Sequence, residues 1–268
     1  MASVIARTED STLGPTPPEA GVTVTGEVET GAVIAGGERP LWLWLHRLQP
    51  GASLAWSQPK QDHLIYVWEG VVEVGRMKLA ADEAYVIEHG GRGEVRAGAE
   101  PAAVLHFHRP EDYPEAAARP GGHTHLLAGG AIRRGVDVRA SVGRSLFADA
   151  SCPTCAVWLH GNQLPAGLKT DRHYHTEDEI IVVTGGAMRL GRLDYGRGSV
   201  LAIDAETRYA FMCGDDGLAF VNFRPAPPTY VVADHSKPPQ DERALLLNGL
   251  ARSKATTSAL ATPIRPAA

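Results

Sequence analysis

Residues 167–186 read GLKTDRHYHTEDEIIVVTGG, and this stretch is the most informative part of the chain. His173 and His175 are two residues apart, and Glu179 follows four residues later. On an extended strand, residues of equal parity point to one face, so the two imidazoles and the carboxylate can converge on one point. Two imidazoles and one carboxylate form a divalent-metal site that leaves coordination positions open for water, substrate or oxygen.

The same stretch resembles the first conserved motif of the cupin superfamily, G-x5-H-x-H-x3-E-x6-G. Its defined positions are occupied here by Gly167, His173, His175, Glu179 and Gly186. The resemblance implies a small double-stranded β-helix barrel with a metal ion in its mouth. Within that family, the two histidines and the glutamate are the usual metal ligands.

The second cupin motif, G-x5-P-x-G-x2-H-x3-N, is matched mainly by spacing. Gly198 fits, but Asp204, Glu206, Tyr209 and Cys213 occupy the remaining positions, so Tyr209 replaces the histidine that is the family's fourth ligand. A free phenol has a pKa of about 10, which makes it a poor ligand unless a metal lowers that value. Tyr209 could bind the metal as phenolate, act as an acid, base or hydrogen-bond donor, or form an aromatic wall. We favour the second role.

The first half of the chain repeats the second half. The register is steady except for a two-residue slip that aligns Trp44-Leu45-His46 with Trp158-Leu159-His160. The aligned pairs are Gly51 with Gly167, Gly70 with Gly186, Ile87 with Ile203, and His106 with Asn222. A repeat of this length is a domain rather than a solenoid unit. Two tandem cupin barrels in an all-β chain are therefore predicted.

The first half keeps the glycines of the motif and loses its ligands. Ser57 aligns with His173, Pro59 with His175, and His63 with Glu179. Glycines serve backbone turns, whereas imidazoles and carboxylates serve the metal. The N-terminal barrel is therefore expected to fold without binding metal at that place.

Five segments follow from the repeat and from local composition. We expect a flexible arm at residues 1–21, the N-terminal barrel at 22–110, a Pro-rich linker at 111–135, the metal-binding barrel at 136–226, and an extension at 227–268. Within the extension, the stretch DERALLLNGLARS, which starts at Asp241, has a helical pattern with an acidic first turn and a glycine stop. The last dozen residues are rich in Ala, Thr and Pro and are expected to be disordered.

Two other pairs have ligand-type spacing. Cys152 and Cys155 form a C-x-x-C, but the repeat places them in a turn, and no second cysteine pair completes a zinc site. His123 and His125 lie in the expected linker and lack a following carboxylate. We interpret the cysteines as structural and these histidines as solvated. His160 aligns with His46 of the other barrel, which favours a structural role over a ligand role.

Arginines cluster in sequence around the proposed mouth of the C-terminal barrel. Arg208, next to Tyr209, is the one we select with Tyr209 as a candidate catalytic residue. An arginine near a metal can clamp a substrate carboxylate or enolate, whereas the alternative is a surface ion pair with Asp171, Asp178 or Asp194. The cluster contains Arg172, Arg189, Arg192 and Arg208.

Composition narrows the class of protein. The 268 residues carry a net charge of −5, which gives no reason to expect nucleic acid or an acidic membrane as a partner. Three cysteines cannot form a disulfide framework, and no apolar run is long enough to span a bilayer, so a cytoplasmic location is expected. A homodimer is possible because an exposed strand edge needs covering.

Three functions remain open. The favoured one is a metal-dependent enzyme acting on a small organic substrate, most plausibly a non-haem Fe(II) oxygenase or dioxygenase. In the second, a Mn, Ni or Zn ion acts as a Lewis acid in isomerisation, cyclisation, decarboxylation or hydrolysis. The third is a non-catalytic small-molecule-binding protein. An open three-ligand site is typical of catalytic rather than structural metals, which argues against the third.

Overall fold

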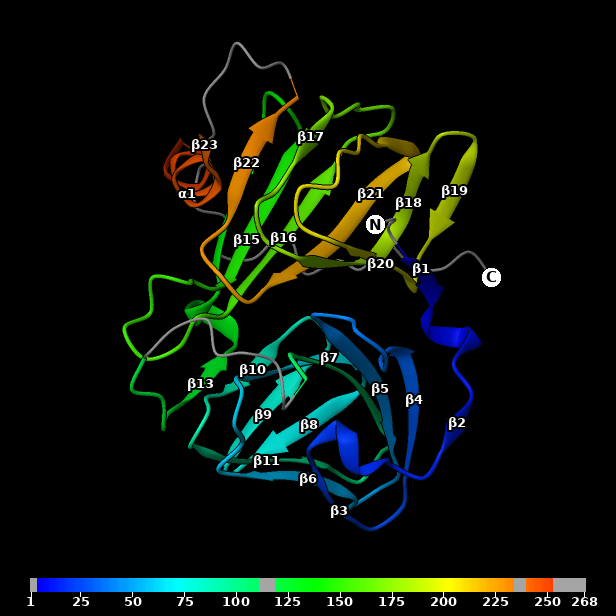
Figure 1. The fold of residues 1–268 in the computed structure, drawn as a ribbon, viewed down its shortest axis with the longest axis vertical. Helices are drawn as coiled ribbons and strands as arrows, with labels where there is room; N and C mark the ends of the chain where they lie inside the picture. The colour runs from blue at the N-terminus through cyan, green and yellow to red at the C-terminus, as the bar shows by residue number, and fades with distance from the viewer. Residues whose placement is uncertain (1–3, 111–118, 234–239, 253–268) are drawn as a thin grey trace. The chain divides into compact units, whose positions relative to one another are not determined.

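The computed structural model describes residues 4–110, 119–233 and 240–252 (Figure 1). The chain divides into two compact units. The N-terminal unit contains Ile5–Ala131 and Asp149–Val157, and the C-terminal unit contains Met1–Val4, Ile132–Ala148 and Trp158–Ala268. The segment 149–157, expected within the C-terminal barrel, is therefore part of the N-terminal unit.

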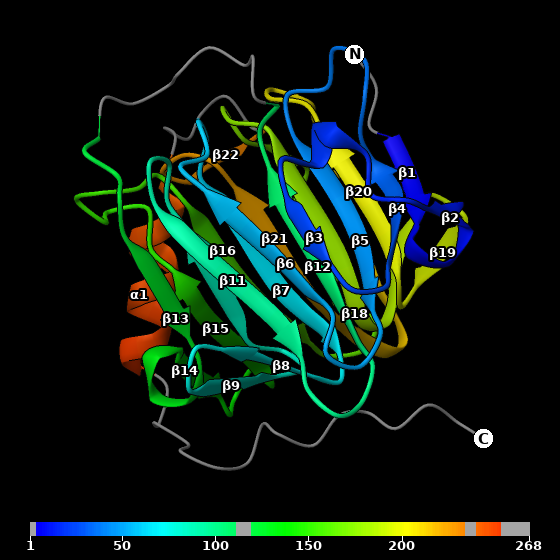
Figure 2. The ribbon, with the colours of Figure 1, turned by 90° about the horizontal axis from the view of Figure 1, so that it is seen from below.

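The N-terminal unit is built from two antiparallel sheets. One has the order β13-β10-β7-β12-β5-β4-β2 and the other β3-β6-β11-β8-β9. Figure 2 shows β7, β12 and β5 running side by side, as their pairing requires. The strands are β2 (Leu13–Gly14), β3 (Thr23–Thr25), β4 (Val28–Ile34), β5 (Trp42–Leu48), β6 (Ser53–Ser57), β7 (His63–Glu69), β8 (Val71–Val74), β9 (Met77–Ala80), β10 (Ala84–Ile87), β11 (Arg92–Ala97), β12 (Ala102–His108) and β13 (Thr124–Leu127).

The C-terminal unit contains a large antiparallel sheet and a small one. The large sheet includes the order β20-β18-β21-β16-β15-β14, with β19 paired to β18, and the small sheet has the order β17-β22-β23. The strands are β14 (Arg133–Asp137), β15 (Val142–Ala148), β16 (Trp158–Leu164), β17 (His173–Tyr174), β18 (Glu179–Leu190), β19 (Leu193–Gly196), β20 (Ser199–Ile203), β21 (Met212–Arg224), β22 (Thr229–Val232) and β23 (Gln240–Asp241). The expected all-β class is thus confirmed.

The two units share one strand order, which supports the predicted repeat. The run β10-β7-β12-β5-β4 corresponds to β20-β18-β21-β16-β15. The two-residue slip, however, is absent from the strand pairing. Trp42 lies opposite His108 as Trp158 lies opposite Arg224, so Trp42, not Trp44, is the counterpart of Trp158. The alignment of His160 with His46 therefore no longer supports a structural role for His160.

The repeated glycines meet a backbone requirement in both units. Gly70 and Gly186 have φ angles of 77° and 62°, in the left-handed region that favours glycine. A Cβ atom would lie 2.7 Å from the Pro101 carbonyl oxygen at Gly70, and 2.2 Å from the Gly217 carbonyl oxygen at Gly186. Both repeated glycines therefore allow a left-handed backbone and a close approach to a neighbouring carbonyl.

Strand parity separates an apolar interior from a polar end in the C-terminal barrel. On β18, Ile181 and Val183 belong to the hydrophobic core, and Glu179 shares their parity at the start of the strand. On β21, Leu218 and Phe220 are core residues, and Asn222 follows them at the same parity. The β-branched and aromatic residues form the strands, and the polar residues end up together at one end of the interior.

The N-terminal residues differ from the expected flexible arm. They form β1 (Val4–Arg7), two 3-10 turns (Thr8–Asp10 and Pro18–Ala20), and β2. In β2, Leu13 pairs with Gly31 of β4, so the segment completes one edge of a sheet.

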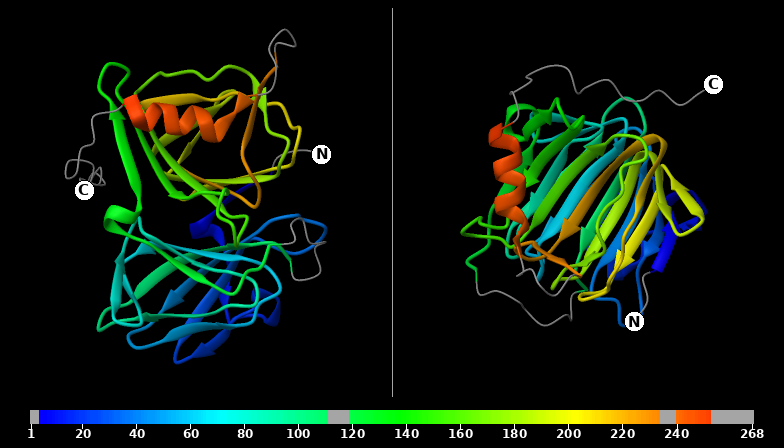
Figure 3. Two further views of the ribbon diagram at one scale, coloured as in Figure 1. Left: turned by 90° about the vertical axis from the view of Figure 1, so that its left-hand side faces the viewer. Right: turned by 90° about the horizontal axis from the view of Figure 1, so that it is seen from above.

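The predicted C-terminal helix is present as α1 (Glu242–Arg252), which packs against β14 and β15 (Figure 3). Gly249 lies within the helix instead of ending it, because the helical pattern continues to Arg252. The last dozen residues, expected to be disordered, lie outside the described residues. Among the described residues, no helix has the length and apolarity needed to cross a membrane. A 3-10 turn at Gly129–Ala131 completes the helical elements of the described chain.

Candidate functional site

The predicted ligand stretch lies at the polar end of the C-terminal barrel. His173 is in β17, His175 follows that strand, and Glu179 begins β18. Tyr209 is brought to His173 by two reciprocal backbone hydrogen bonds of 2.9 Å each. The side chains of His173, His175 and Glu179 are all buried.

Both histidines are oriented through backbone carbonyls. His173 Nδ1 lies 2.7 Å from the Asp171 carbonyl oxygen, and His175 Nδ1 contacts the Thr229 carbonyl oxygen. A carbonyl only accepts a hydrogen bond, so each Nδ1 carries a proton, and in a neutral ring Nε2 then presents a lone pair. Burial lowers the pKa of His173, which keeps its imidazole neutral at neutral pH. This tautomer and this type of carbonyl contact are typical of metal-ligating histidines.

Glu179 is held as a carboxylate by donors on both oxygens. Tyr209 Oη donates to Oε1 at 2.6 Å, and Asn222 Nδ2 donates to Oε2 at 2.6 Å. Burial favours the protonated form, but the guanidinium of Arg224 and these hydrogen bonds outweigh it and lower the pKa of Glu179 to about 2. The group is therefore a charged, oriented ligand at neutral pH.

Tyr209 lies between the carboxylate and one imidazole. Its Oη is 2.6 Å from Glu179 Oε1 and 3.1 Å from His175 Nε2. Burial and the neighbouring Glu179 charge both raise the pKa of Tyr209 well above its ordinary value, because each disfavours a phenolate. The Tyr209 hydroxyl therefore keeps its proton at neutral pH, which is consistent with the predicted role as an acid or hydrogen-bond donor.

Arg224 is a site residue that the sequence analysis missed. Its side chain is 1% exposed, and its Nη2 lies 2.9 Å from Glu179 Oε2 and 3.2 Å from His175 Nε2. It shares strand parity with Asn222 on β21, and this parity was the sequence signal that could have identified it. Arg208, the arginine that we selected, is instead exposed, with its guanidinium 5.6 Å from the centre of the Tyr174 ring.

Two more carboxylates surround Arg224. Its Nη1 lies 3.0 Å from Glu177 Oε1 and also contacts Glu242 Oε2 at the start of α1. Burial favours a neutral Glu242, but Arg224 outweighs this and lowers the pKa of Glu242. Three carboxylates thus face one guanidinium, and the site carries an excess of negative charge.

His160 also lies near this group of charges. Its Nδ1 accepts a hydrogen bond of 2.8 Å from Trp158 Nε1, and its Nε2 is 3.9 Å from Glu242 Oε1. Burial lowers the pKa of His160 to about 4, so the ring is neutral. His160 lies in β16 and packs beside the charged residues as a neutral ring.

The chemistry of the donor atoms suits a divalent cation, but the side chain of Arg224 competes with such an ion for two of them. The two lone-pair nitrogens, the ionised carboxylate and the excess negative charge all favour a cation. Arg224 Nη2, however, already contacts His175 Nε2 and Glu179 Oε2, so it and a metal ion would compete for the same atoms. His175 Nε2 and Glu179 Oε1 are 3.7 Å apart. Among the described residues of the C-terminal barrel, His175, Glu177 and Glu242 have donor atoms that all lie within 4.8 Å of one another.

His173 stands slightly apart from that group. Its ring centre is 5.1 Å from that of His175, and it stacks on Tyr230 at 4.6 Å. The predicted set of His173, His175 and Glu179 is thus brought to one end of the barrel, with His175 and Glu179 closest together. Its role as a metal-ligand set remains a prediction.

The corresponding part of the N-terminal barrel contains a chain of buried imidazoles. His63 Nδ1 lies 2.7 Å from His106 Nε2, and His106 Nδ1 lies 3.1 Å from His46 Nε2. His63, His106 and His108 have donor atoms within 4.8 Å of one another. His106 and His108 come from β12 and His46 from β5, all outside the stretch that matches the ligand motif. One of His106 and His108 was expected to face into this barrel and form hydrogen bonds there. Most of these nitrogens are engaged with one another or, at His108, with Trp44 Nε1.

Comparison with known proteins defines the fold. No model of a known protein family matches this chain, and no curated protein matches it in sequence. Among solved structures, oxalate decarboxylase of Lactobacillus farciminis in its formate complex is 12% identical, with a TM-score of 0.66, covering 89% of this chain and 91% of its own.

Two further solved structures are similar. A proposed glyoxylate-induced protein of Pseudomonas aeruginosa is 15% identical, with a TM-score of 0.64, covering 83% of this chain and 88% of its own. A proposed dioxygenase of Nostoc punctiforme is 12% identical, with a TM-score of 0.59, covering 84% and 82%. These are cupin-fold proteins, so the predicted all-β tandem cupin fold is confirmed. At such low identity the similarity extends to the fold alone.

Proposed function

We propose that this chain is a metal-dependent cupin enzyme that acts on a small organic substrate in its C-terminal barrel. The observation that carries the proposal is the pair of histidines whose Nδ1 atoms contact backbone carbonyls, next to a carboxylate whose pKa is about 2. His173, His175 and Glu179 would hold the metal. An ion bound there would act as a Lewis acid that polarises a substrate oxygen and stabilises the negative charge that develops on it.

The residues around the ligands supply the other parts of the site. Tyr209 keeps its proton at neutral pH and can donate it, or a hydrogen bond, to a substrate oxygen. Asn222 fixes the orientation of Glu179 through its 2.6 Å hydrogen bond. Arg224 provides a buried positive charge beside the same carboxylate and holds it ionised.

Oxygenation is the reaction that we propose first, with Fe(II) as the metal. A set of two histidines and one carboxylate leaves several coordination positions open, as non-haem iron oxygenases require for substrate and dioxygen. The similarity to a proposed dioxygenase of Nostoc punctiforme is compatible with this reaction.

Decarboxylation without net oxidation, with Mn as the metal, is the second candidate. It is favoured by the protonated Tyr209, which can deliver a proton to the carbon that loses CO2. The similarity to oxalate decarboxylase is compatible with it.

Metal content and gas exchange test the proposal together. The full chain would be loaded separately with Fe(II) and with Mn2+ and given catechols, enols, diketones and oxalate. Oxygen uptake with the iron form supports oxygenation, and CO2 release without oxygen uptake supports decarboxylation. A chain that binds neither metal would overturn the proposal. A metal-loaded chain that turns over none of these substrates would favour the non-catalytic binding function instead.

A further inference from the structure

A second group of ligand-type side chains lies in the N-terminal unit, away from the residues discussed so far. Glu88 directly follows β10, and His125 lies in β13, the neighbouring strand. Val86 pairs with His125, which makes Glu88 a diagonal neighbour of His125 across the two strands. His125 was expected to be solvated in a linker, and the structure corrects this because β13 pairs with β10. His125 Nε2 is 2.6 Å from Glu88 Oε1.

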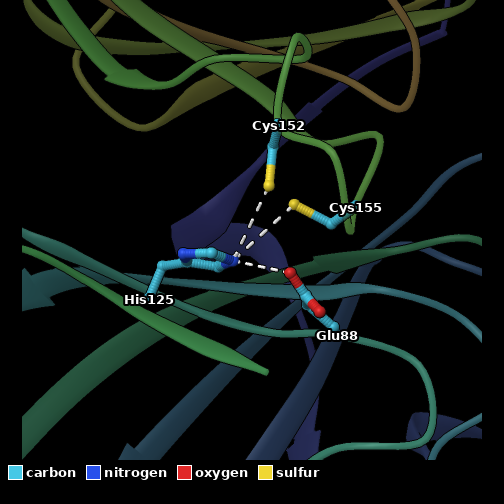
Figure 4. A group of neighbouring side chains, drawn as sticks. All are labelled: Glu88, His125, Cys152 and Cys155. Carbon is cyan, nitrogen blue, oxygen red and sulfur yellow. Dashed lines mark hydrogen bonds and ion pairs between the residues drawn. The ribbon is translucent and has the colours of Figure 1, made fainter. Parts of the chain in front are cut away.

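The Cys152–Cys155 turn approaches the same point from another part of the chain. Cys152 Sγ lies 4.0 Å from His125 Nε2, and Cys155 Sγ lies 3.9 Å from it. Figure 4 shows both sulfurs and the carboxylate directed at the same ring nitrogen. The two cysteines are three residues apart, as in many zinc sites. The sequence analysis dismissed this pair because it looked for a second pair of cysteines, whereas a histidine and a glutamate occupy the remaining positions.

The turn is fixed in this orientation by its backbone. Arg119 Nη1 donates to the carbonyl oxygens of Ala150, Cys152 and Cys155. The Thr154 carbonyl oxygen accepts a hydrogen bond of 3.1 Å from the Gly121 amide. These hydrogen bonds to the carbonyl oxygens hold the turn so that both sulfurs point toward His125, and no disulfide is needed to hold it.

The distances match a tetrahedral zinc site before the ion is bound. All four donor atoms lie within 4.8 Å of one another. With Zn–S bonds of about 2.3 Å and Zn–N bonds of about 2.0 Å, a sulfur and a nitrogen on one zinc ion are about 3.5 Å apart. The observed separations of 4.0 and 3.9 Å need only a small contraction, whereas His125 Nε2 and Glu88 Oε1, now 2.6 Å apart, would separate to about 3.3 Å.

The charges also suit a divalent cation. Two thiolates and one carboxylate would carry three negative charges, and Zn2+ and Arg119 would balance them. Asp62 lies nearby, but its Oδ2 accepts a hydrogen bond from the Ala156 amide and its Oδ1 contacts His89. Thr154 Oγ1 donates to Glu88 Oε1 at 2.5 Å, which orients the carboxylate. Glu88 is fully buried and also accepts a hydrogen bond of 2.9 Å from the His123 amide, so its carboxylate is held in place.

We propose that Glu88, His125, Cys152 and Cys155 form a closed structural Zn2+ site that ties the 149–157 segment to β10 and β13. Four protein ligands with no open position are typical of structural zinc. A disulfide between Cys152 and Cys155 is the competing use of the pair. It would not explain why a histidine and a buried glutamate converge on the same two sulfurs. The inference concerns the N-terminal unit and does not depend on the function proposed for the C-terminal barrel.

Cobalt is the probe that separates the two metal sites. The full chain, purified under reducing conditions and stripped of metal, would be titrated with Co2+ and then with Zn2+. We expect a thiolate-to-cobalt charge-transfer band that saturates at one ion per chain and disappears when Zn2+ displaces Co2+. Cobalt in the C-terminal barrel has no thiolate ligand and gives no such band. The band therefore reports on the N-terminal site alone, whatever happens in the C-terminal barrel.

Matched variants locate the site. Cys152→Ser and Cys155→Ser should abolish the band, whereas Cys213→Ser should retain it. His125→Ala should weaken Zn2+ binding by more than the roughly tenfold loss that removal of an outer partner causes, and Thr154→Val by about that amount. His123→Ala, which changes an exposed histidine two residues away, should have no effect.

Two results would overturn the proposal. One is a wild-type chain that shows no thiolate-to-cobalt band, which requires no variant to fold. The other is a Cys152–Cys155 disulfide, detected by mass in protein kept under reductant.

Discussion

Arg224 Nη2 lies 2.9 Å from Glu179 Oε2, and both side chains are only 1% exposed. The guanidinium thus neutralises a carboxylate that the sequence assigns to metal binding, and it also contacts His175 Nε2 at 3.2 Å. Arg224 thus places a positive charge beside a histidine nitrogen and a carboxylate oxygen, and a metal ion would be stabilised at the same place. Arg224 is therefore both a support for Glu179 and a competitor of the metal.

Replacing Arg224 with glutamine separates these two effects. Removing one partner of a buried ion pair leaves uncompensated charge, so the free energy of unfolding without metal should fall by about 3–5 kcal/mol. The apparent affinity for Mn2+ should rise, because the competing cation is gone. Urea unfolding in EDTA and calorimetric titration measure the two quantities. Arg189→Gln removes an exposed partner of Asp194 and should change neither. Weaker Mn2+ binding by Arg224→Gln would contradict the competition.

Replacing Tyr209 with phenylalanine tests the role of its hydroxyl group. The phenol donates to Glu179 at 2.6 Å and is not a phenolate, so the variant should keep about one metal ion per chain. Turnover should be lost, and the free energy of unfolding should fall by about 1–3 kcal/mol because a buried acceptor loses its donor. Tyr174→Phe, at a ring that faces Arg208, is the matched control. Loss of the metal would show that Tyr209 is a ligand.

The buried histidines of the N-terminal barrel predict a stability that falls in acid. Burial lowers the pKa of His46 to about 3 and that of His108 to about 4, below the value of about 6.5 in an unfolded chain. Between these values the unfolded state binds more protons, so the free energy of unfolding should decline as the pH falls below about 6.5. Each such histidine lowers the free energy of unfolding by up to about 1.4 kcal/mol for each pH unit below about 6.5.

Unfolding at pH 7.5, 6 and 5 measures this slope. His46→Gln keeps a polar group beside Thr30 and His106 but cannot titrate, so the slope should be shallower by one histidine. His123→Gln, at an exposed position, should leave the slope unchanged. A wild-type chain equally stable at pH 5 and 7.5 would show that these histidines are not buried as neutral rings.

Two glycines with the same φ of 62° separate backbone strain from steric contact. Gly186→Ala would place Cβ 2.2 Å from the Gly217 carbonyl oxygen, whereas Gly191→Ala meets nothing within 4 Å. Gly191→Ala should cost about 1–2 kcal/mol for a left-handed alanine, and Gly186→Ala should cost clearly more. Thermal unfolding measures both, and equal losses would refute the close strand approach at Gly186.

The fold was predictable because its signals are local and occur twice. Gly70 follows β7 and Gly186 lies within β18, both with left-handed φ angles, and the apolar runs that precede them identify these two strands. The alignment of the first repeated strand was wrong by two residues. Two tryptophans, Trp42 and Trp44, lie two residues apart there, and the sequence pattern Trp-x-His selects the second of them. Only the pairing of Trp42 with His108 and of Trp158 with Arg224 resolves it.

The sites were predictable only where one motif supplies every residue. His173, His175 and Glu179 are adjacent in sequence, but Arg224 is 45 residues beyond Glu179 and belongs to no motif. The zinc-type group is harder still, because His125 is 37 residues from Glu88 and 27 from Cys152. Sequence spacing carries no information about such contacts until the pairing of the strands is known.

Mn2+ binding, followed by electron paramagnetic resonance, tests the proposed metal centre most directly, because Mn2+ prefers oxygen and nitrogen donors to thiolates. The full chain should bind one Mn2+ ion, and His175→Ala and Glu179→Gln should each abolish that signal. His63→Ala and Cys152→Ser should keep it. Mn2+ bound with wild-type affinity by both His175→Ala and Glu179→Gln would contradict a metal centre in the C-terminal barrel.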